Sequence, residues 1–163
     1  MKLATPGFEA KVADRDALGA RVGQLARPIV FTNGVFDILH RGHATYLDQG
    51  RQLGASLVVA LNSDSSVRQL GKGPERPIHA AADRAFVLAA LEAVTLVTIF
   101  DEPVPLQVLE IVRPDIYVKG GDYDMEKIEE ARLVRSWGGT ALALPFVHGH
   151  STTRTVRRMR GSA

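Results

Sequence analysis

The chain has 163 residues, of which 45% are hydrophobic and 23% charged, as is usual for one globular domain with a sizeable core. Its formal net charge of +2 is too small to favour a protein that binds nucleic acid or membrane surfaces. The sequence has no cysteine, which excludes thiolate catalysis and disulfides, and no apolar run approaches the ~20 residues that span a bilayer. The first seven residues lack an apolar signal core, so we expect a cytoplasmic protein.

Helical and strand-like patterns alternate along the chain. Residues 14–26 carry apolar side chains at helical spacing, and Arg27-Pro28 ends this pattern because a residue before proline avoids the α region. After this point we expect strands at 29–32, 57–61, 95–100, 116–118 and 140–144, and helices at 44–53, 83–91, 105–112, 125–137 and from 152 onward. On the 83–91 helix we expect an inward face made of Phe86, Val87, Ala90 and Leu91.

Continuously apolar strands that alternate with helices indicate a parallel sheet covered on both faces. We therefore predict one doubly wound, Rossmann-like α/β domain with a five-stranded parallel sheet over residues 28–163, preceded by an N-terminal helical extension over residues 1–27. In such sheets, a ligand binds outside the carboxyl ends of the strands, where the strand order reverses. The loop 71–77 is rich in glycine and proline, so we expect it to lack regular structure and to be a candidate lid.

The first candidate site is the turn after the 29–32 strand, with the sequence TNGVFDILHRGH. His40 and His43 bracket Gly42, which leaves room for a nucleotide to lie against the backbone. Backbone N–H groups at a helix N-terminus favour phosphate, so we predict that both imidazoles contact a polyphosphate and stabilise charge in the transition state. The alternatives are a structural histidine pair or a metal pair, but the sequence offers no good third metal ligand, so we predict no protein-bound metal.

The same turn contains further candidate residues. Gly34 permits a tight backbone geometry in which N–H groups face a phosphate, and an ordinary strand-to-helix loop is the alternative. We predict nucleotide contacts here from Thr32, Asn33, Gly34 and Phe36. Asp37 either orients a histidine or the loop, or has a structural Asx-type role.

Two later segments also carry candidate ligand-binding residues. At the end of the 116–118 strand, Gly120 and Gly121 let a ligand approach the main chain beside Lys119 and Asp122, unless they only form a turn. Three consecutive hydroxyls, Ser151-Thr152-Thr153, begin the final helix, where they suit either an N-cap or a β- or γ-phosphate.

Three cations complete the set. Lys72, Arg76 and Arg84 are candidates for clamping pyrophosphate and the phosphate of a second substrate, and a solvated surface charge is the alternative for each.

The turn with His40, Gly42 and His43 resembles the H-x-G-H signature of the cytidylyltransferase-like nucleotidyltransferases, and Ser151-Thr152-Thr153 resembles the second signature of that superfamily. Within it, residues 29–158 are similar to the heptose 1-phosphate adenylyltransferases, which often form the C-terminal half of a bifunctional sugar kinase and adenylyltransferase. The narrower resemblance depends on three segments: 32–40, 62–64 and 118–123.

This resemblance implies adenylyl transfer from ATP to D-glycero-β-D-manno-heptose 1-phosphate, giving ADP-heptose for lipopolysaccharide. It implies Mg²⁺ bound mainly through the ATP phosphates, a separate heptose kinase upstream, no nucleic-acid or membrane partner, and a possible homodimer. As catalytic residues it implies His40, His43, Lys72 and Arg84, and as sugar-phosphate contacts Asp37, Asn62, Asp64 and Arg76. Two alternatives stay open, namely a cytidylyltransferase for a phosphorylated alcohol such as glycerol 3-phosphate, and a non-catalytic nucleotide sensor.

Overall fold

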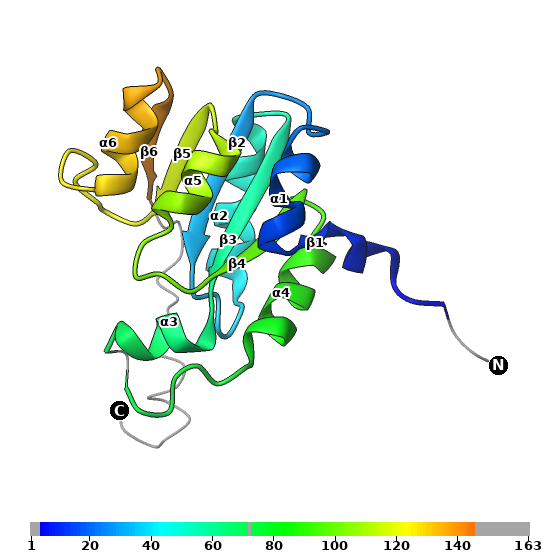
Figure 1. Ribbon diagram of the computed structural model, residues 1–163. Helices are drawn as coiled ribbons and strands as arrows, with labels where there is room; N and C mark the ends of the chain where they lie inside the picture. The colour runs from blue at the N-terminus through cyan, green and yellow to red at the C-terminus, as the bar shows by residue number, and fades with distance from the viewer. Residues whose placement is uncertain (1–3, 72, 146–163) are drawn as a thin grey trace.

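The computed structural model describes residues 4–71 and 73–145, and six parallel strands form one sheet in it (Figure 1). The strands are β1 (Val12–Ala13), β2 (Ile29–Gly34), β3 (Ser56–Asn62), β4 (Leu96–Phe100), β5 (Ile116–Gly120) and β6 (Thr140–Leu144). The helices are a 3₁₀ turn η1 (Gly7–Lys11), α1 (Arg15–Val22), α2 (Arg41–Gln52), α3 (Asp64–Gln69), α4 (Ala81–Ala90), α5 (Leu106–Val112) and α6 (Glu129–Ser136). No helix in the described part of the chain is long and apolar enough to cross a bilayer.

The predicted doubly wound parallel fold is confirmed, but the predicted number of five strands is wrong. The sixth strand, β1, pairs in parallel with β4 through Val12 and Ala13. It lies within the segment 1–27, which therefore contributes an edge strand to the sheet as well as η1 and α1. Two residues are too short a segment to show either the alternation or the apolar run that marks a strand in sequence.

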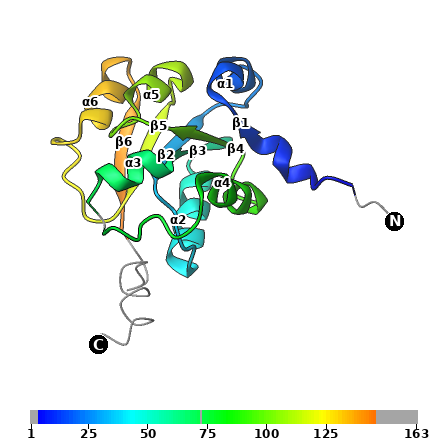
Figure 2. The same cartoon turned by 60° about the horizontal axis from the view of Figure 1, so that its bottom comes forward.

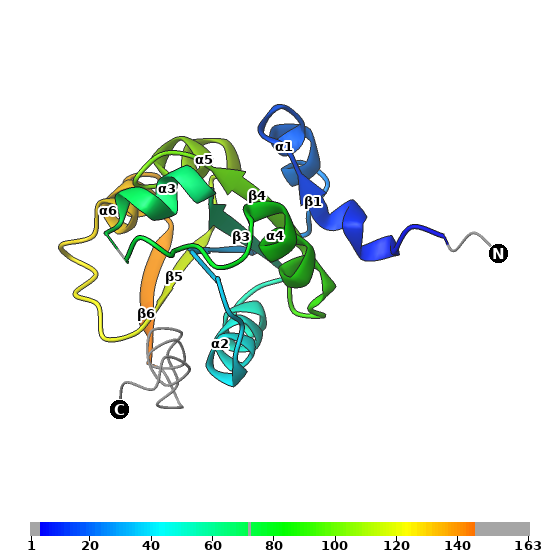
Figure 3. The ribbon, with the colours of Figure 1, turned by 90° about the horizontal axis from the view of Figure 1, so that it is seen from below.

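Helices cover both faces of the sheet (Figure 3). Phe31, Val58 and Tyr117 point to the face covered by α1, α5 and α6. Their strand neighbours Val30 and Val59 point to the opposite face, where α2 and α4 pack. This alternation buries both faces of the central strands, which explains why they are continuously apolar.

Helix α4 shows a different inward face from the predicted one. Phe86 and Val87 are 38% and 48% exposed, whereas Ala85 and Leu88 are buried. The prediction is therefore wrong for Phe86, Val87 and Ala90, which are exposed. Arg84 is only 2% exposed and hydrogen-bonded to backbone carbonyls, so it lies on the buried face together with Ala85 and Leu88.

Other helices also begin at different residues from the predicted ones. Helix α2 begins at Arg41, three residues early, because His40 has the extended backbone of an N-cap. Helix α3 was not predicted, and the Ser63 side chain caps it by accepting from the backbone N–H of Ser66. Helix α6 begins at Glu129 instead of residue 125, and the predicted tail helix lies outside the described residues.

The order of the strands is β1-β4-β3-β2-β5-β6. The chain runs outward from β2 through β3 and β4, and then returns to the other side of β2 to form β5 and β6. The switch point therefore lies between β2 and β5, where ligands bind in sheets of this type. The carboxyl ends of the strands are turned toward the viewer in Figure 2, with α3 beside them.

Candidate nucleotide site at the carboxyl ends of the strands

The turn after β2 places three aromatic rings against one another. Phe36 has a left-handed backbone with φ of 47°, which is unusual for a residue other than glycine. Its ring folds back over Gly34, where an added Cβ would lie 2.9 Å from the Phe36 ring. The Phe36 ring contacts His43 edge-on with centroids 5.4 Å apart, and His43 stacks on His40 at 3.9 Å. The backbone strain and the glycine thus set the position of the histidine pair.

Both histidines lie at the N-terminus of α2. The carbonyl of His40 accepts from the N–H groups of His43 (2.9 Å) and Ala44 (3.2 Å), which starts the helix. By helix geometry, the N–H groups of Arg41 and Gly42 have no partner within the helix. This helix start therefore combines backbone donors, the positive end of a helix dipole and two imidazoles, which together suit a polyphosphate.

Thr32 is buried and ties β2 to its neighbours. Its hydroxyl lies 2.6 Å from the Tyr46 hydroxyl, which donates to the carbonyl of Val118 at 3.0 Å. Because the Tyr46 proton is used for Val118, Thr32 donates to Tyr46. Burial raises the pKa of Tyr46, so this hydroxyl stays neutral and the link between β2, α2 and β5 persists.

A polar cluster joins β2, β5 and α6. The Tyr117 hydroxyl lies 2.9 Å from Oδ1 of Asn33, and Nζ of Lys119 lies 3.3 Å from the Tyr117 oxygen and 3.4 Å from Oε1 of Glu130. Asn33 and Lys119 were predicted from the sequence, whereas Tyr117, Glu130 and Tyr46 were missed. The signal for Glu130 is a carboxylate next to Ala131 on the buried face of an amphipathic helix.

Asp37 fastens the loop before α4 to the turn after β2. Its buried carboxylate accepts from the N–H groups of Ile78 and His79, each at 2.9 Å, and from Nε of Arg76. Burial alone would raise the pKa of Asp37, but the N–H groups of His79 and Ile78 and the Arg76 guanidinium more than offset it and hold the pKa below its usual value. The described residues of the 71–77 loop form no helix or strand, as predicted.

Arg84 forms a second connection in the same region. Its guanidinium donates to the carbonyls of Val35 (2.7 Å) and His79 (2.9 Å) and to the carboxylate of Asp64 (2.7 Å). Asn62, buried next to this pair, donates to the Ser66 hydroxyl at 2.9 Å. These groups bond to the protein itself, and they bring the turn after β2, the loop before α4 and the start of α3 together.

The remaining predicted residues are placed as follows. Gly120 ends β5, and Asp122 follows it on the exposed surface beyond Gly121. The structure thus brings the β2 turn and the β5 end together at the switch point. Lys72, Ser151, Thr152 and Thr153 lie outside the described residues.

A cavity of about 300 Å³ opens beside the β2 turn. Phe36, Leu39 and Val87 supply apolar lining, and His79 and Asp83 supply polar groups. Such a combination suits a small ligand with both apolar and polar groups. Within the described residues, no three His, Asp or Glu side chains gather to hold a metal, and the carboxylates of Asp37 and Asp64 are paired with arginines.

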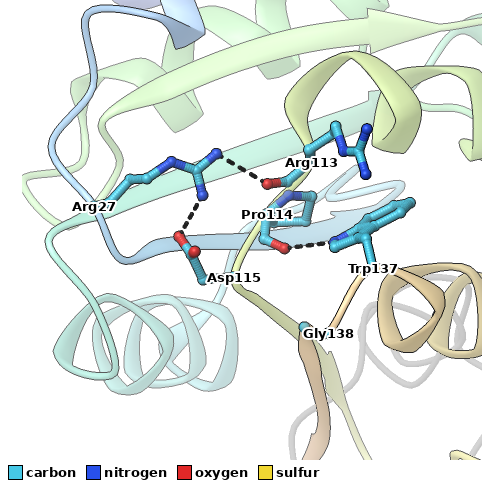
Figure 4. Close-up of a pocket in the computed structure, with 7 residues that line it drawn as sticks. Arg27, Arg113, Pro114, Asp115, Trp137 and Gly138 are labelled. Atoms are coloured by element: carbon cyan, nitrogen blue, oxygen red, sulfur yellow. Dashed lines mark hydrogen bonds and ion pairs between the residues drawn. The ribbon is translucent and has the colours of Figure 1, made fainter.

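A second pocket, of about 290 Å³, lies at the opposite, amino ends of β2, β5 and β6 (Figure 4). Arg27 pairs there with Asp115 at 2.8 Å and donates to the carbonyl of Arg113. The guanidinium of Arg113 lies 5.3 Å from the centre of the Trp137 ring. This pocket shares no residue with the histidine turn.

The model of the cytidylyltransferase-like family matches residues 31–158, which include the histidine turn and the strands on both sides of the switch point. The chain belongs to the cytidylyltransferase-like family. The resemblance seen in the sequence is therefore confirmed. This match covers most of the described domain, so it includes both the parallel sheet and the histidine turn.

Relatives agree with this assignment. A D-beta-D-heptose 1-phosphate adenylyltransferase of Bordetella bronchiseptica is 57% identical over 94% of this chain and 96% of its own length. A bifunctional protein HldE of Geotalea uraniireducens is 47% identical over 96% of this chain, but the chain spans only 32% of that protein. Among solved structures, a lipopolysaccharide core biosynthesis protein of Thermoplasma volcanium is 31% identical with a TM-score of 0.60, over 75% of this chain and 98% of that one.

A pantoate-beta-alanine ligase of Francisella tularensis has a similar TM-score of 0.62, over 90% of this chain and 72% of that chain, at 12% identity. That likeness concerns the fold alone, since the same parallel sheet serves more than one chemistry.

Proposed function

We propose that this protein transfers the adenylyl group of ATP to D-glycero-β-D-manno-heptose 1-phosphate, giving ADP-heptose and pyrophosphate for lipopolysaccharide synthesis. The observation that carries the proposal is the 57% identity to a heptose 1-phosphate adenylyltransferase along nearly the whole of both chains. The histidine turn at the start of α2 supports the proposal, because a helix N-terminus beside two imidazoles suits a polyphosphate.

The reaction is an in-line displacement at the α-phosphorus of ATP. An oxygen of the sugar phosphate forms a bond to this phosphorus while the bond to the β-phosphate oxygen breaks, and pyrophosphate leaves. The attacking phosphate is already anionic, so no strong general base is required. Alignment of the two substrates and neutralisation of their charge then supply most of the rate acceleration.

The proposed roles follow the geometry of the turn. His40 and His43 donate hydrogen bonds to the triphosphate, and Gly42 lets the triphosphate approach the start of α2. Asn33, at the end of β2, and Lys119, at the end of β5, face the switch point and contact the nucleotide. Thr32, Gly34 and Phe36 shape the turn, and Gly120 and Asp122 border it. Lys72, Ser151, Thr152 and Thr153 remain predicted phosphate contacts.

The contacts of the buried groups refine the roles expected from the sequence. Arg84 and Arg76 bond to protein carboxylates and carbonyls, so in this proposal they position the loops that carry the chemistry. Asp37, Asn62 and Asp64 act in the same way, and the sugar phosphate lies in the cavity beside the β2 turn. Since the carboxylates of Asp37 and Asp64 are committed to arginines, Mg²⁺ would be held mainly by the phosphates of ATP, whose charge it would neutralise.

The test is pyrophosphate release with Mg²⁺, with ATP, CTP and GTP each paired with heptose 1-phosphate and with glycerol 3-phosphate. Release with ATP and the heptose alone is the expected result. Release with CTP and glycerol 3-phosphate would keep the site but replace the substrates. ATP binding without release in any pairing would favour the nucleotide sensor.

We further propose a kinase upstream, because the proposed reaction consumes a sugar 1-phosphate that phosphorylation of the sugar supplies. The proposed reaction consumes ATP, which fits the cytoplasm. A homodimer is also proposed, and sedimentation of the purified chain tests it.

A further inference from the structure

Glu130 is a buried carboxylate to which the proposed chemistry gives no role. It lies in the first turn of α6, which packs against β5, and its side chain is 6% exposed. A buried carboxylate is costly unless charged or polar groups surround it. Its partners are Nζ of Lys119 at 3.4 Å and the hydroxyl of Tyr117 at 3.5 Å.

Through these two partners, Glu130 reaches the switch point. Lys119 donates to the Tyr117 oxygen at 3.3 Å, and the single Tyr117 proton is left for Oδ1 of Asn33 at 2.9 Å or for Glu130 at 3.5 Å. The shorter distance favours Asn33. Burial and the Glu130 charge raise the pKa of Tyr117, so the hydroxyl keeps the proton that it donates.

This arrangement orients the amide of Asn33. With Oδ1 accepting from Tyr117, the Nδ2 group is the donor end of the side chain, and no group within residues 4–71 and 73–145 accepts from it. Lys119 is held in the same way, between Glu130 and the ring of Tyr123, whose centre lies 5.4 Å from Nζ. The cluster therefore fixes two donors at neighbouring strand ends.

We infer that Glu130 is a positioning residue for the nucleotide: it anchors the Lys119 ammonium and, through Tyr117, sets the amide of Asn33 so that both donate to the bound nucleotide. The inference rests on the proposed function, in which Asn33 and Lys119 contact ATP. Glu130 itself touches no substrate and acts only through its neighbours.

The substitution Glu130→Gln removes the charge and keeps the shape. We expect it to raise the KM for ATP by about fivefold to tenfold, which corresponds to one ordinary hydrogen bond, while kcat changes by less than about twofold. This split follows because the donors hold the nucleotide equally in the ground and transition states. Glu129→Gln, which neutralises the exposed carboxylate next to it, is the matched control and leaves both constants unchanged. A KM that matches the control would overturn the inference.

A double-mutant cycle separates positioning from general damage. If Glu130 acts through Lys119, Glu130→Gln raises the KM for ATP much less in a Lys119→Met background than in the wild type. Independent, additive effects would show that Glu130 does not act through Lys119.

A measurement on the free protein tests this inference independently of the proposed reaction. In ¹⁵N NMR spectra of the free protein, Glu130→Gln is expected to shift the side-chain amide signals of Asn33, and Glu129→Gln is not. If the wild type releases no pyrophosphate in any pairing, the proposed function fails while ATP titration still tests the inference. An unmoved Asn33 amide, or ATP affinity equal in Glu130→Gln and wild type, would overturn it.

Discussion

The two ends of the sheet hold similar residues in different surroundings. At the carboxyl ends, Asp37 pairs with Arg76, and both side chains are at most 5% exposed. At the amino ends, Asp115 pairs with Arg27 at 2.8 Å, but these side chains are 39% and 51% exposed. Each end has an arginine–aspartate pair and a pocket of about 300 Å³, so neither feature alone marks the functional end.

Burial and connectivity distinguish the two ends. The buried pair joins loops from different parts of the chain, and Arg84 adds three further hydrogen bonds across the same loops. Breaking a buried pair costs several kcal/mol, because a charge is left without its partner, whereas an exposed pair contributes about 0–1 kcal/mol. We therefore expect substitutions at the carboxyl ends to have the larger effects. Substitutions of the histidines should lower activity, and substitutions of the buried arginines should lower stability.

The largest effect is expected for His43→Ala. The loss of one transition-state donor should lower kcat by at least about 10²-fold, while the fold stays intact. Pyrophosphate release measures kcat, and far-ultraviolet circular dichroism checks the fold. Wild-type turnover in a folded His43→Ala protein would remove the proposed role of this histidine.

Arg84→Leu is expected to have the largest effect on stability. It leaves the carbonyls of Val35 and His79 and the carboxylate of Asp64 without their donor, which should lower the free energy of unfolding by about 2–4 kcal/mol. Urea denaturation measures this. Arg68→Leu, on the exposed side of α3, is the control and should stay close to the wild type. If Arg84→Leu lowers the free energy of unfolding as little as the control does, the buried guanidinium does not stabilise the loops.

Asp37→Asn is expected to lower the free energy of unfolding by about 1–3 kcal/mol at pH 7, because the amide accepts hydrogen bonds less well than the carboxylate. The folded-state pKa of Asp37 lies below the ordinary value of 3.8, so its carboxylate stabilises the fold above that pH. This contribution is lost as the pH falls through the lowered pKa. Denaturation curves at several pH values should therefore show the wild type and the variant converging below pH 3.8. If the difference in the free energy of unfolding between the two proteins stays constant below pH 3.8, the Asp37 charge is not the source of the stabilisation.

The contrast between the ends also explains what the sequence could reveal. Continuous apolar runs such as 57–61 predicted the central strands, because both faces of the sheet are covered. The turn from Thr32 to His43 was found because its glycines and histidines are adjacent in the chain. Contacts between distant residues could not be read in this way, as with Arg76 and Asp37 or Glu130 and Lys119. Charge and spacing do not show whether an arginine is buried, so the sequence could not reveal the hydrogen bonds of Arg84 to Val35, His79 and Asp64.

The smallest effect is expected for Arg27→Ala at the amino end. The substitution removes the ion pair with Asp115 and the hydrogen bond to the carbonyl of Arg113. Both partners remain accessible to water, since the Asp115 side chain is 39% exposed, and Asp115 keeps its hydrogen bond from the N–H of Ile29. The free energy of unfolding should therefore fall by less than about 1 kcal/mol, and kcat should not change.

Urea denaturation and pyrophosphate release on Arg27→Ala, measured beside Asp37→Asn, compare the two pairs directly. A loss of activity in Arg27→Ala would mean that the amino-end pocket takes part in the reaction, which its separation from the histidine turn does not predict. A loss of stability as large as that of Asp37→Asn would mean that burial does not set the difference between the pairs. If neither occurs, the same two residue types stabilise the protein in proportion to how far water is excluded from them.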